Sequence, residues 1–318
     1  GTIFRLMGRY EEALSDLGKA IELDSTYAWA FAGRGMTYRL MGRYDEALVN
    51  LNRAIELDPT NDWAIAGRGI VYHALGHNEK ALADYNRAIA IDPAYDWAFA
   101  SRGTAYRALG HYDEAITDFN RAIELDPDYE WAIAGRGVAY RLLGRYEEAL
   151  ADLNRAILLK PEYEWAIAER GETYRQLERY EEALVDFNRA IELDPKHPPF
   201  MALRGLVYRQ TGRYEEALAD YNQAIESNPV YNWALHSRGK TYLFLERYEE
   251  ALADFRRALD LNPNEDWYHY QNVVTYQRLS LTTPLQVSLD TAITIATEKH
   301  QTAPTNLNNL FNLALYHT

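Results

Sequence analysis

The sequence contains no cysteine, which excludes disulfide bridges, cysteine-ligated zinc and thiol nucleophiles. Positive charge is scarce: 33 Lys and Arg face 47 Asp and Glu, for a net charge of −14. Such a surface argues against general attraction to nucleic acid or anionic membrane. No run of about 18 apolar residues predicts a membrane span, and the N-terminus lacks the basic-then-apolar pattern of a secretory signal. We therefore expect a folded cytoplasmic chain, in keeping with its 47% hydrophobic and 25% charged residues.

Tryptophan reveals the organisation of the chain. Successive Trp residues are separated by 34 positions, apart from one gap of 68 in which a copy has lost its Trp. A chain of 318 residues would ordinarily suggest two domains, but a fixed period predicts one stacked array of repeats. The seven residues are Trp29, Trp63, Trp97, Trp131, Trp165, Trp233 and Trp267.

Each repeat contains two segments with helical periodicity. The copy 62–93 reads DWAIAGRGIVYHALGHNEKALADYNRAIAIDP, with apolar and small residues at helical spacing on both sides of Gly76. Gly76 suits the end of a helix, where a positive φ is needed. Pro93 ends the second segment, because proline has no N–H donor and restricts the residue before it. Each copy is therefore predicted to be a helical hairpin.

This pattern resembles the tetratricopeptide repeat (TPR) family, with Asp62 as position 1. The family has a bulky residue at position 4, a small one at 8, Tyr at 11, Ala at 20 and 27, an aromatic at 24 and Pro at 32. These fall on Ile65, Gly69, Tyr72, Ala81, Ala88, Tyr85 and Pro93. The resemblance spans residues 1–279 and implies an all-α fold, a right-handed α-α superhelix or TPR solenoid. It further implies a noncatalytic scaffold without a cofactor, which binds a protein or peptide in its concave groove.

The repeat frame divides the chain into three parts. Residues 1–27 form a partial first TPR, with the end of one helix and a complete second helix. Residues 28–265 contain seven complete repeats, and residues 266–318 are degenerate TPR-like helices. In that last part we expect helices at 285–299 and 305–317. Because the first helix is cut and the last has no partner, we expect the chain to be part of a longer protein.

Two charged positions recur in almost every copy. Position 7 is Arg and position 23 is Asp, and an Arg in a helix seam needs a partner or water. We predict a structural ion-pair ladder between first helices and neighbouring second helices; the alternative is a row of ligand-binding arginines. The ladder residues are Arg68, Arg102, Arg136 and Arg170 with Asp84, Asp118, Asp152 and Asp186.

The predicted groove carries aromatic and arginine residues. By resemblance, positions 2, 5, 9, 12 and 13 of the first helix face the groove, which places the seven Trp there. Position 12 adds Arg39, Arg107, Arg141, Arg175 and Arg209. This composition is typical of interface hot spots and suits an acidic or aromatic ligand. The alternative, compatible with the first, is that each Trp packs on the preceding loop.

Two other functions remain open, and no catalytic or metal site is predicted. The array is alternatively a sensor or scaffold segment of a larger bacterial signalling or defence enzyme with a nucleotide-binding switch, or a self-assembling module. Repeated carboxylate pairs such as Glu147 and Glu148 lie where they favour the helix dipole, and catalysis does not need so many equivalent copies. His73 and His77 are four residues apart, but Gly76 is expected to end the helix between them.

Overall fold

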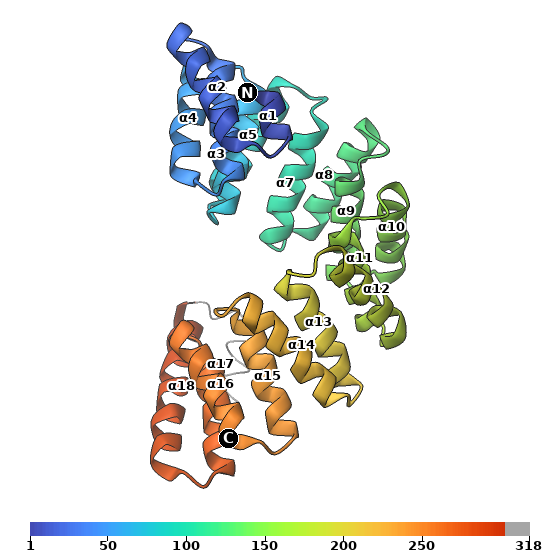
Figure 1. The fold of residues 1–318 in the computed structure, drawn as a ribbon, viewed down its shortest axis with the longest axis vertical. Coiled ribbons are helices and arrows are strands. Elements are labelled where there is room, and N and C mark those ends of the chain that lie inside the picture. The colour runs from blue at the N-terminus through green and yellow to red at the C-terminus, as the bar shows by residue number, and fades with distance from the viewer. Residues whose placement is uncertain (303–318) are drawn as a thin grey trace. The chain divides into compact units, whose positions relative to one another are not determined.

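The computed structural model describes residues 1–302, in which every regular element is a helix. Short turns join the helices into consecutive hairpins (Figure 1). The first helices of the hairpins are α1 (Thr2–Leu6), α3 (Ala28–Leu40), α5 (Asp62–Ala74), α7 (Asp96–Ala108), α9 (Glu130–Leu142), α11 (Glu164–Gln176), α13 (Pro198–Gln210), α15 (Asn232–Phe244) and α17 (Asp266–Arg278). The second helices are α2 (Tyr10–Leu23), α4 (Tyr44–Leu57), α6 (Asn78–Ile91), α8 (Tyr112–Leu125), α10 (Tyr146–Leu159), α12 (Tyr180–Leu193), α14 (Tyr214–Ser227), α16 (Tyr248–Leu261) and α18 (Thr282–Thr302).

The described residues confirm the prediction of an all-α array of hairpins. The helix expected at 285–299 lies within α18, which starts earlier, at Thr282. Pro284 is compatible with this start, because the first turn of a helix leaves its N–H groups unbonded in any case. The helix expected at 305–317 lies outside the described residues.

The turn inside each hairpin depends on a residue with positive φ. Gly76 has φ +77°, and its N–H donates to the His73 carbonyl at 2.9 Å. The next N–H, of His77, donates to the Tyr72 carbonyl at 2.8 Å, which completes a Schellman cap. Most hairpins have glycine at this place, but Glu178 occupies it with φ +58°, where a side chain strains the backbone.

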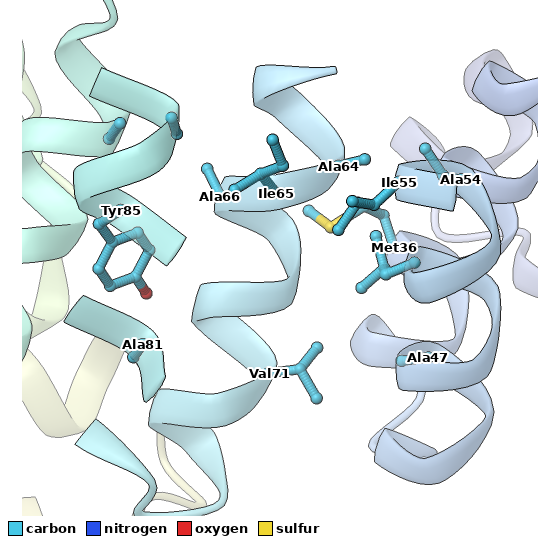
Figure 2. Close-up of a cluster of buried hydrophobic side chains, with 14 of the residues drawn as sticks. Met36, Ala47, Ala54, Ile55, Ala64, Ile65, Ala66, Val71, Ala81 and Tyr85 are labelled. Carbon is cyan, nitrogen blue, oxygen red and sulfur yellow. The ribbon is translucent and has the colours of Figure 1, made fainter. Parts of the chain in front are cut away.

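The core consists of small residues on one helix facing large ones on the next. Ala81 and Tyr85 of α6 are almost completely buried (Figure 2). A Cβ added to Gly69 of α5 would lie 2.7 Å from the Tyr85 ring, so only glycine fits at this crossing. Met36 of α3 lies on the other side of α5 and belongs, with Ile65 of α5, to the same buried cluster. A single hairpin cannot cover its apolar face, so neighbouring hairpins share each cluster.

The contacts divide the chain into two compact units. Unit 1 comprises Gly1–Ala166, and unit 2 comprises Ile167–Thr318, described to residue 302. The boundary falls inside α11. Each unit repeats the same hairpin packing, and each is treated by itself below.

Candidate functional site

The arginine at position 7 joins three helices. In unit 1, Arg136 of α9 donates from Nε and Nη2 to the two carboxylate oxygens of Asp152 on α10, both at 2.7 Å. Its third nitrogen, Nη1, donates to Asn120 Oδ1 on α8 at 2.7 Å. The Asp152 side chain is 10% exposed, and its hydrogen bond raises the pKa of Arg136. The guanidinium therefore links its own hairpin to the preceding one.

The same contact repeats along the chain. The carboxylate always comes from the second helix of the same hairpin, in the pairs Arg68–Asp84, Arg102–Asp118, Arg136–Asp152, Arg170–Asp186, Arg204–Asp220 and Arg238–Asp254. The preceding hairpin supplies an asparagine at position 25, which sequence reasoning missed: Asn52, Asn86, Asn120, Asn188 and Asn222. Its recurrence sixteen residues before each arginine was the available signal. With these partners, the position-7 arginines have few donors left for a ligand.

At the last hairpin, the Arg of position 7 and the Asn of position 25 have exchanged places. Position 7 of α17 is Asn272, which is 1% exposed, and position 25 of α16 is Arg256. Arg256 donates from Nε and Nη2 to the Tyr276 hydroxyl at 3.2 and 3.1 Å. An arginine therefore still reaches across this boundary between hairpins, but from the opposite helix.

The tryptophan row packs against aromatic rings and also borders cavities. Most members lie beside the Tyr two residues earlier; the rings of Trp97 and Tyr95 are 5.7 Å apart. The same arrangement holds for Trp131, Trp165 and Trp233 at 5.8–6.1 Å. Trp29, which is 53% exposed, stacks on Trp63 at 5.6 Å. Trp267 instead donates from Nε1 to His236 Nε2 at 3.0 Å.

The arginine row at position 12 is half-buried, and its members have different surroundings. Arg175 makes a bidentate pair with Glu172, which lies three residues earlier on the same helix. Arg39 has no ion pair within residues 1–302, and its buried Nε has no hydrogen-bond partner. Burial lowers the pKa of Arg39, and the nearby Arg5 lowers it further. The Nε of Arg209 is also buried without a partner. Arg107 and Arg141 are half-buried on α7 and α9.

Two cavities in unit 1 bring these rows together. The larger, of about 680 Å³, borders Gly1 and is lined by Trp29 and Trp63. Arg5 lies over the Trp63 ring at 5.5 Å. The second, of about 380 Å³, spans four hairpins and is lined by Arg39, Ile70, His73, Tyr85, Trp97, Ser101, Thr104, Tyr129 and Trp131. We call this second space the Arg39 cavity.

The described part of the chain shows no metal site and no membrane span. Within residues 1–302, no three His, Asp or Glu side chains lie close enough together to hold a metal ion. His73 is oriented by Asn78, with Nδ1 2.7 Å from its Oδ1. No helix in the same range combines the length and apolar character needed to cross a bilayer.

Models of known protein families match the repeats of this chain. Models described as TPR repeat match residues 1–42, 35–76, 69–110, 103–143 and 205–245. Models described as tetratricopeptide repeat match 131–163, 165–197, 187–219 and 233–265. The chain belongs to the tetratricopeptide repeat family. A TPR array is generally a noncatalytic scaffold typical of protein–protein interaction. No curated protein matches the chain.

Solved structures agree on the TPR fold. The Cut9–Hcn1 hetero-tetramer of the APC/C has a TM-score of 0.67 and 17% identity; the match covers 96% of this chain and 58% of that one. A TPR protein from Parabacteroides merdae has a TM-score of 0.62 and 21% identity, over 83% of this chain and 99% of that one. Pseudomonas aeruginosa pilF has a TM-score of 0.55 and 18% identity, over 65% and 93%. At these identities the likeness establishes the fold alone.

Proposed function

We propose that the chain is a noncatalytic scaffold that binds a peptide, or an extended segment of a protein, along unit 1. One observation supports this most directly: the tryptophan and arginine rows meet at the Arg39 cavity. Trp97 and Trp131 provide apolar walls, and Arg39 provides a guanidinium without an internal carboxylate. Aromatic and arginine anchors in a partly enclosed pocket are the side chains that contribute most to binding energy.

The rigidity of the hairpins favours binding without large rearrangement. The Trp97 ring already lies against Tyr95, and the Trp131 ring lies 5.9 Å from Tyr129. Rings that are fixed before binding lose little conformational entropy when a ligand packs on them. The Arg39 guanidinium suits a ligand with an acidic group despite the net charge of −14. We therefore propose an acidic peptide with aromatic or apolar neighbours as the ligand.

Peptide display tests the proposal. Random 12-residue peptides are selected on the whole chain, and the affinities of the enriched peptides are measured for wild type and for Trp97→Ala/Trp131→Ala. We expect the double variant to lose about tenfold or more in affinity, since each ring is a central anchor.

The matched control is Trp165→Ala. Trp165 has the same repeat position and a comparable Tyr neighbour at 5.8 Å, but it does not line the Arg39 cavity. Its affinity should stay within about twofold of wild type, and circular dichroism should show that all variants are folded. Equal losses in the control and the double variant, or a selection that enriches no peptide, would exclude this groove as the binding surface.

A further inference from the structure

The Arg39 cavity contains a cation that forms no ion pair within residues 1–302. Arg39 is half-buried, its Nε is enclosed without a hydrogen-bond partner, and no ion pair within residues 1–302 involves it. A partly buried guanidinium costs free energy unless an anion or a set of acceptors compensates it. The position-7 arginines obtain that compensation from Asp, but Arg39 does not.

Two of the residues that line the same cavity, Tyr85 and Ser101, carry a hydroxyl group and are almost completely buried. Ser101 is 3% exposed, and its Oγ has no hydrogen-bond partner. Tyr85 is 1% exposed and also lines the cavity. At the corresponding positions of the next boundary between hairpins, the chain has Gly135 and Phe119, which carry no hydroxyl. Buried polar atoms in folded proteins nearly always have a partner, so the Ser101 Oγ needs an explanation.

The same three residue types recur together in unit 2. Tyr221 and Ser237 occupy the positions of Tyr85 and Ser101 four repeats further along the chain. The arginine beside them, Arg209, also comes from position 12, but from the hairpin of Tyr221 itself, where the hairpin of Tyr85 has His73. Tyr221 and Ser237 are both buried, and the Tyr221 hydroxyl and the Arg209 Nε have no hydrogen-bond partner. Burial raises the pKa of Tyr221 to about 12, while Arg209 and Ser237 beside it act in the opposite direction. In this sequence, Tyr occurs at position 24 only as Tyr85 and Tyr221, and in both cases the next repeat has Ser at position 6, Ser101 and Ser237.

Unit 2 also shows how a carboxylate fits an arginine of this row. The Glu172 side chain is 13% exposed and accepts from Arg175 Nε and Nη2, both at 2.7 Å. Glu172 lies at position 9, where the helix of Arg39 has Met36. The chain therefore supplies its own acidic side chain to Arg175 but not to Arg39.

We propose that Arg39, Tyr85 and Ser101 form a subsite for the side-chain carboxylate of an acidic residue in a bound peptide. The guanidinium and the two hydroxyls donate to the carboxylate oxygens. The walls formed by Trp97 and Trp131 exclude water and contact the neighbouring residues of the ligand. Charge-assisted hydrogen bonds in such an enclosed site are stronger than those at an exposed surface. This inference rests on the proposed function and specifies its ligand chemistry.

The test uses peptides selected on the whole chain with Arg209→Leu, which removes the arginine of the related trio. Each selected peptide is compared with a twin in which Glu or Asp becomes Gln or Asn, and with a version that has an amidated C-terminus. We expect the side-chain twin to bind about tenfold more weakly or worse, since it loses the charged acceptor. The C-terminal amide should bind like its parent.

The protein variants use residues that other hairpins already have. Tyr85→Phe/Ser101→Gly copies Phe119 and Gly135, and Arg39→Leu copies Leu243 at position 12. In either variant, we expect the difference in affinity between a selected peptide and its Gln or Asn twin to shrink to about threefold or less. A further variant, Thr104→Glu, places a carboxylate on a residue that lines the cavity and should repel the acidic peptide.

The matched charge control is Arg145→Leu, which removes a 46%-exposed arginine paired with Glu148. This variant should leave the difference in affinity between a selected peptide and its Gln or Asn twin unchanged. Equal binding of the twins, dependence on the C-terminal carboxylate, or an equal effect of Arg145→Leu would each overturn the subsite. If peptides still require Trp97 and Trp131 in that case, the proposed function stands while the subsite fails. If no peptide is enriched, both fail.

Discussion

Replacement of Arg136 by leucine tests whether the recurring Arg–Asp–Asn contact holds the stack together. The substitution deletes three hydrogen bonds of 2.7 Å and leaves the Asp152 carboxylate, 10% exposed, without its counter-charge. Removing one partner of a fully buried ion pair costs about 3–5 kcal/mol. Arg136 is 18% exposed, so water compensates part of this loss, and we expect about 2–4 kcal/mol.

Urea unfolding followed by far-UV circular dichroism measures the loss. Urea is preferred to guanidinium chloride, because a salt would screen the ion pair. Long repeat arrays lose two-state behaviour, so hydrogen exchange of the α9 and α10 amides gives a local reading of the same effect. Faster exchange should begin at these two helices and at α8, which carries Asn120.

Two further variants separate the ion pair from simple loss of packing. Asp152→Asn reproduces the contact of the first complete hairpin, where Arg34 Nε donates to Asn50 Oδ1 at 2.6 Å, and should cost only about 1 kcal/mol. Arg136→Leu/Asp152→Leu removes both charges and should recover much of the stability. The exposed pair Arg145–Glu148 serves as control: Arg145→Ala should leave the free energy of unfolding almost unchanged. A loss below about 1 kcal/mol for Arg136→Leu, or a double variant less stable than the single one, would refute the reasoning.

Three other predictions follow from single features. Gly144 has φ +74°, so Gly144→Ala should lower the free energy of urea unfolding by about 1 kcal/mol. Glu178 occupies the same turn position with φ +58°, so Glu178→Gly should raise that free energy by a similar amount, and changes of the same sign in the two variants would contradict this reasoning. Burial, aided by nearby cations, lowers the pKa of His236 to about 4. The unfolded state, with its higher pKa, takes up the proton first, so stability is full above pH 6.5 and falls towards pH 4. Relative to His236→Ala, the free energy of unfolding of wild type should fall by about 2 kcal/mol between pH 7 and pH 5. Identical pH profiles for the two proteins would show that His236 does not cause the loss of stability in acid. Asn272→Arg alone should destabilise by placing two cations at one boundary, whereas adding Arg256→Asn removes this repulsion and restores the Arg–Asn half of the regular contact; thermal melts that show no rescue would argue against the exchange of residues.

Periodicity made most of the fold predictable. The 34-residue spacing of Trp, the glycine of most turns and the proline after most second helices indicated the hairpins from the sequence alone. Local rules were sufficient, because the cap at Gly76 and the end of a helix near Pro93 depend on neighbouring residues only. The start of α18 was less predictable, since Pro284 is compatible with a first turn as well as with a break.

The partners of the position-7 arginines were only partly predictable. Because nearly every copy repeats Asp at position 23, Arg136 had one candidate sixteen residues ahead and another eighteen residues behind. The crossing of the helices decides between them, and periodicity alone carries no information on that crossing. Packing selects Asp152 of the same hairpin and leaves Asn120 to contact the arginine from the preceding one.

The Arg39 cavity was the least predictable feature, because it results from departures from the repeat rather than from the repeat itself. Ser101 and Tyr85 belong to different helices, and each looks like ordinary variation when its own hairpin is read alone. Their meaning depends on a third residue, Arg39, in yet another hairpin, and on the absence of an acidic neighbour like Glu172. Repeats that are nearly identical can build the same backbone at every boundary. A binding site that distinguishes one boundary from the next must therefore come from the few positions at which the copies differ.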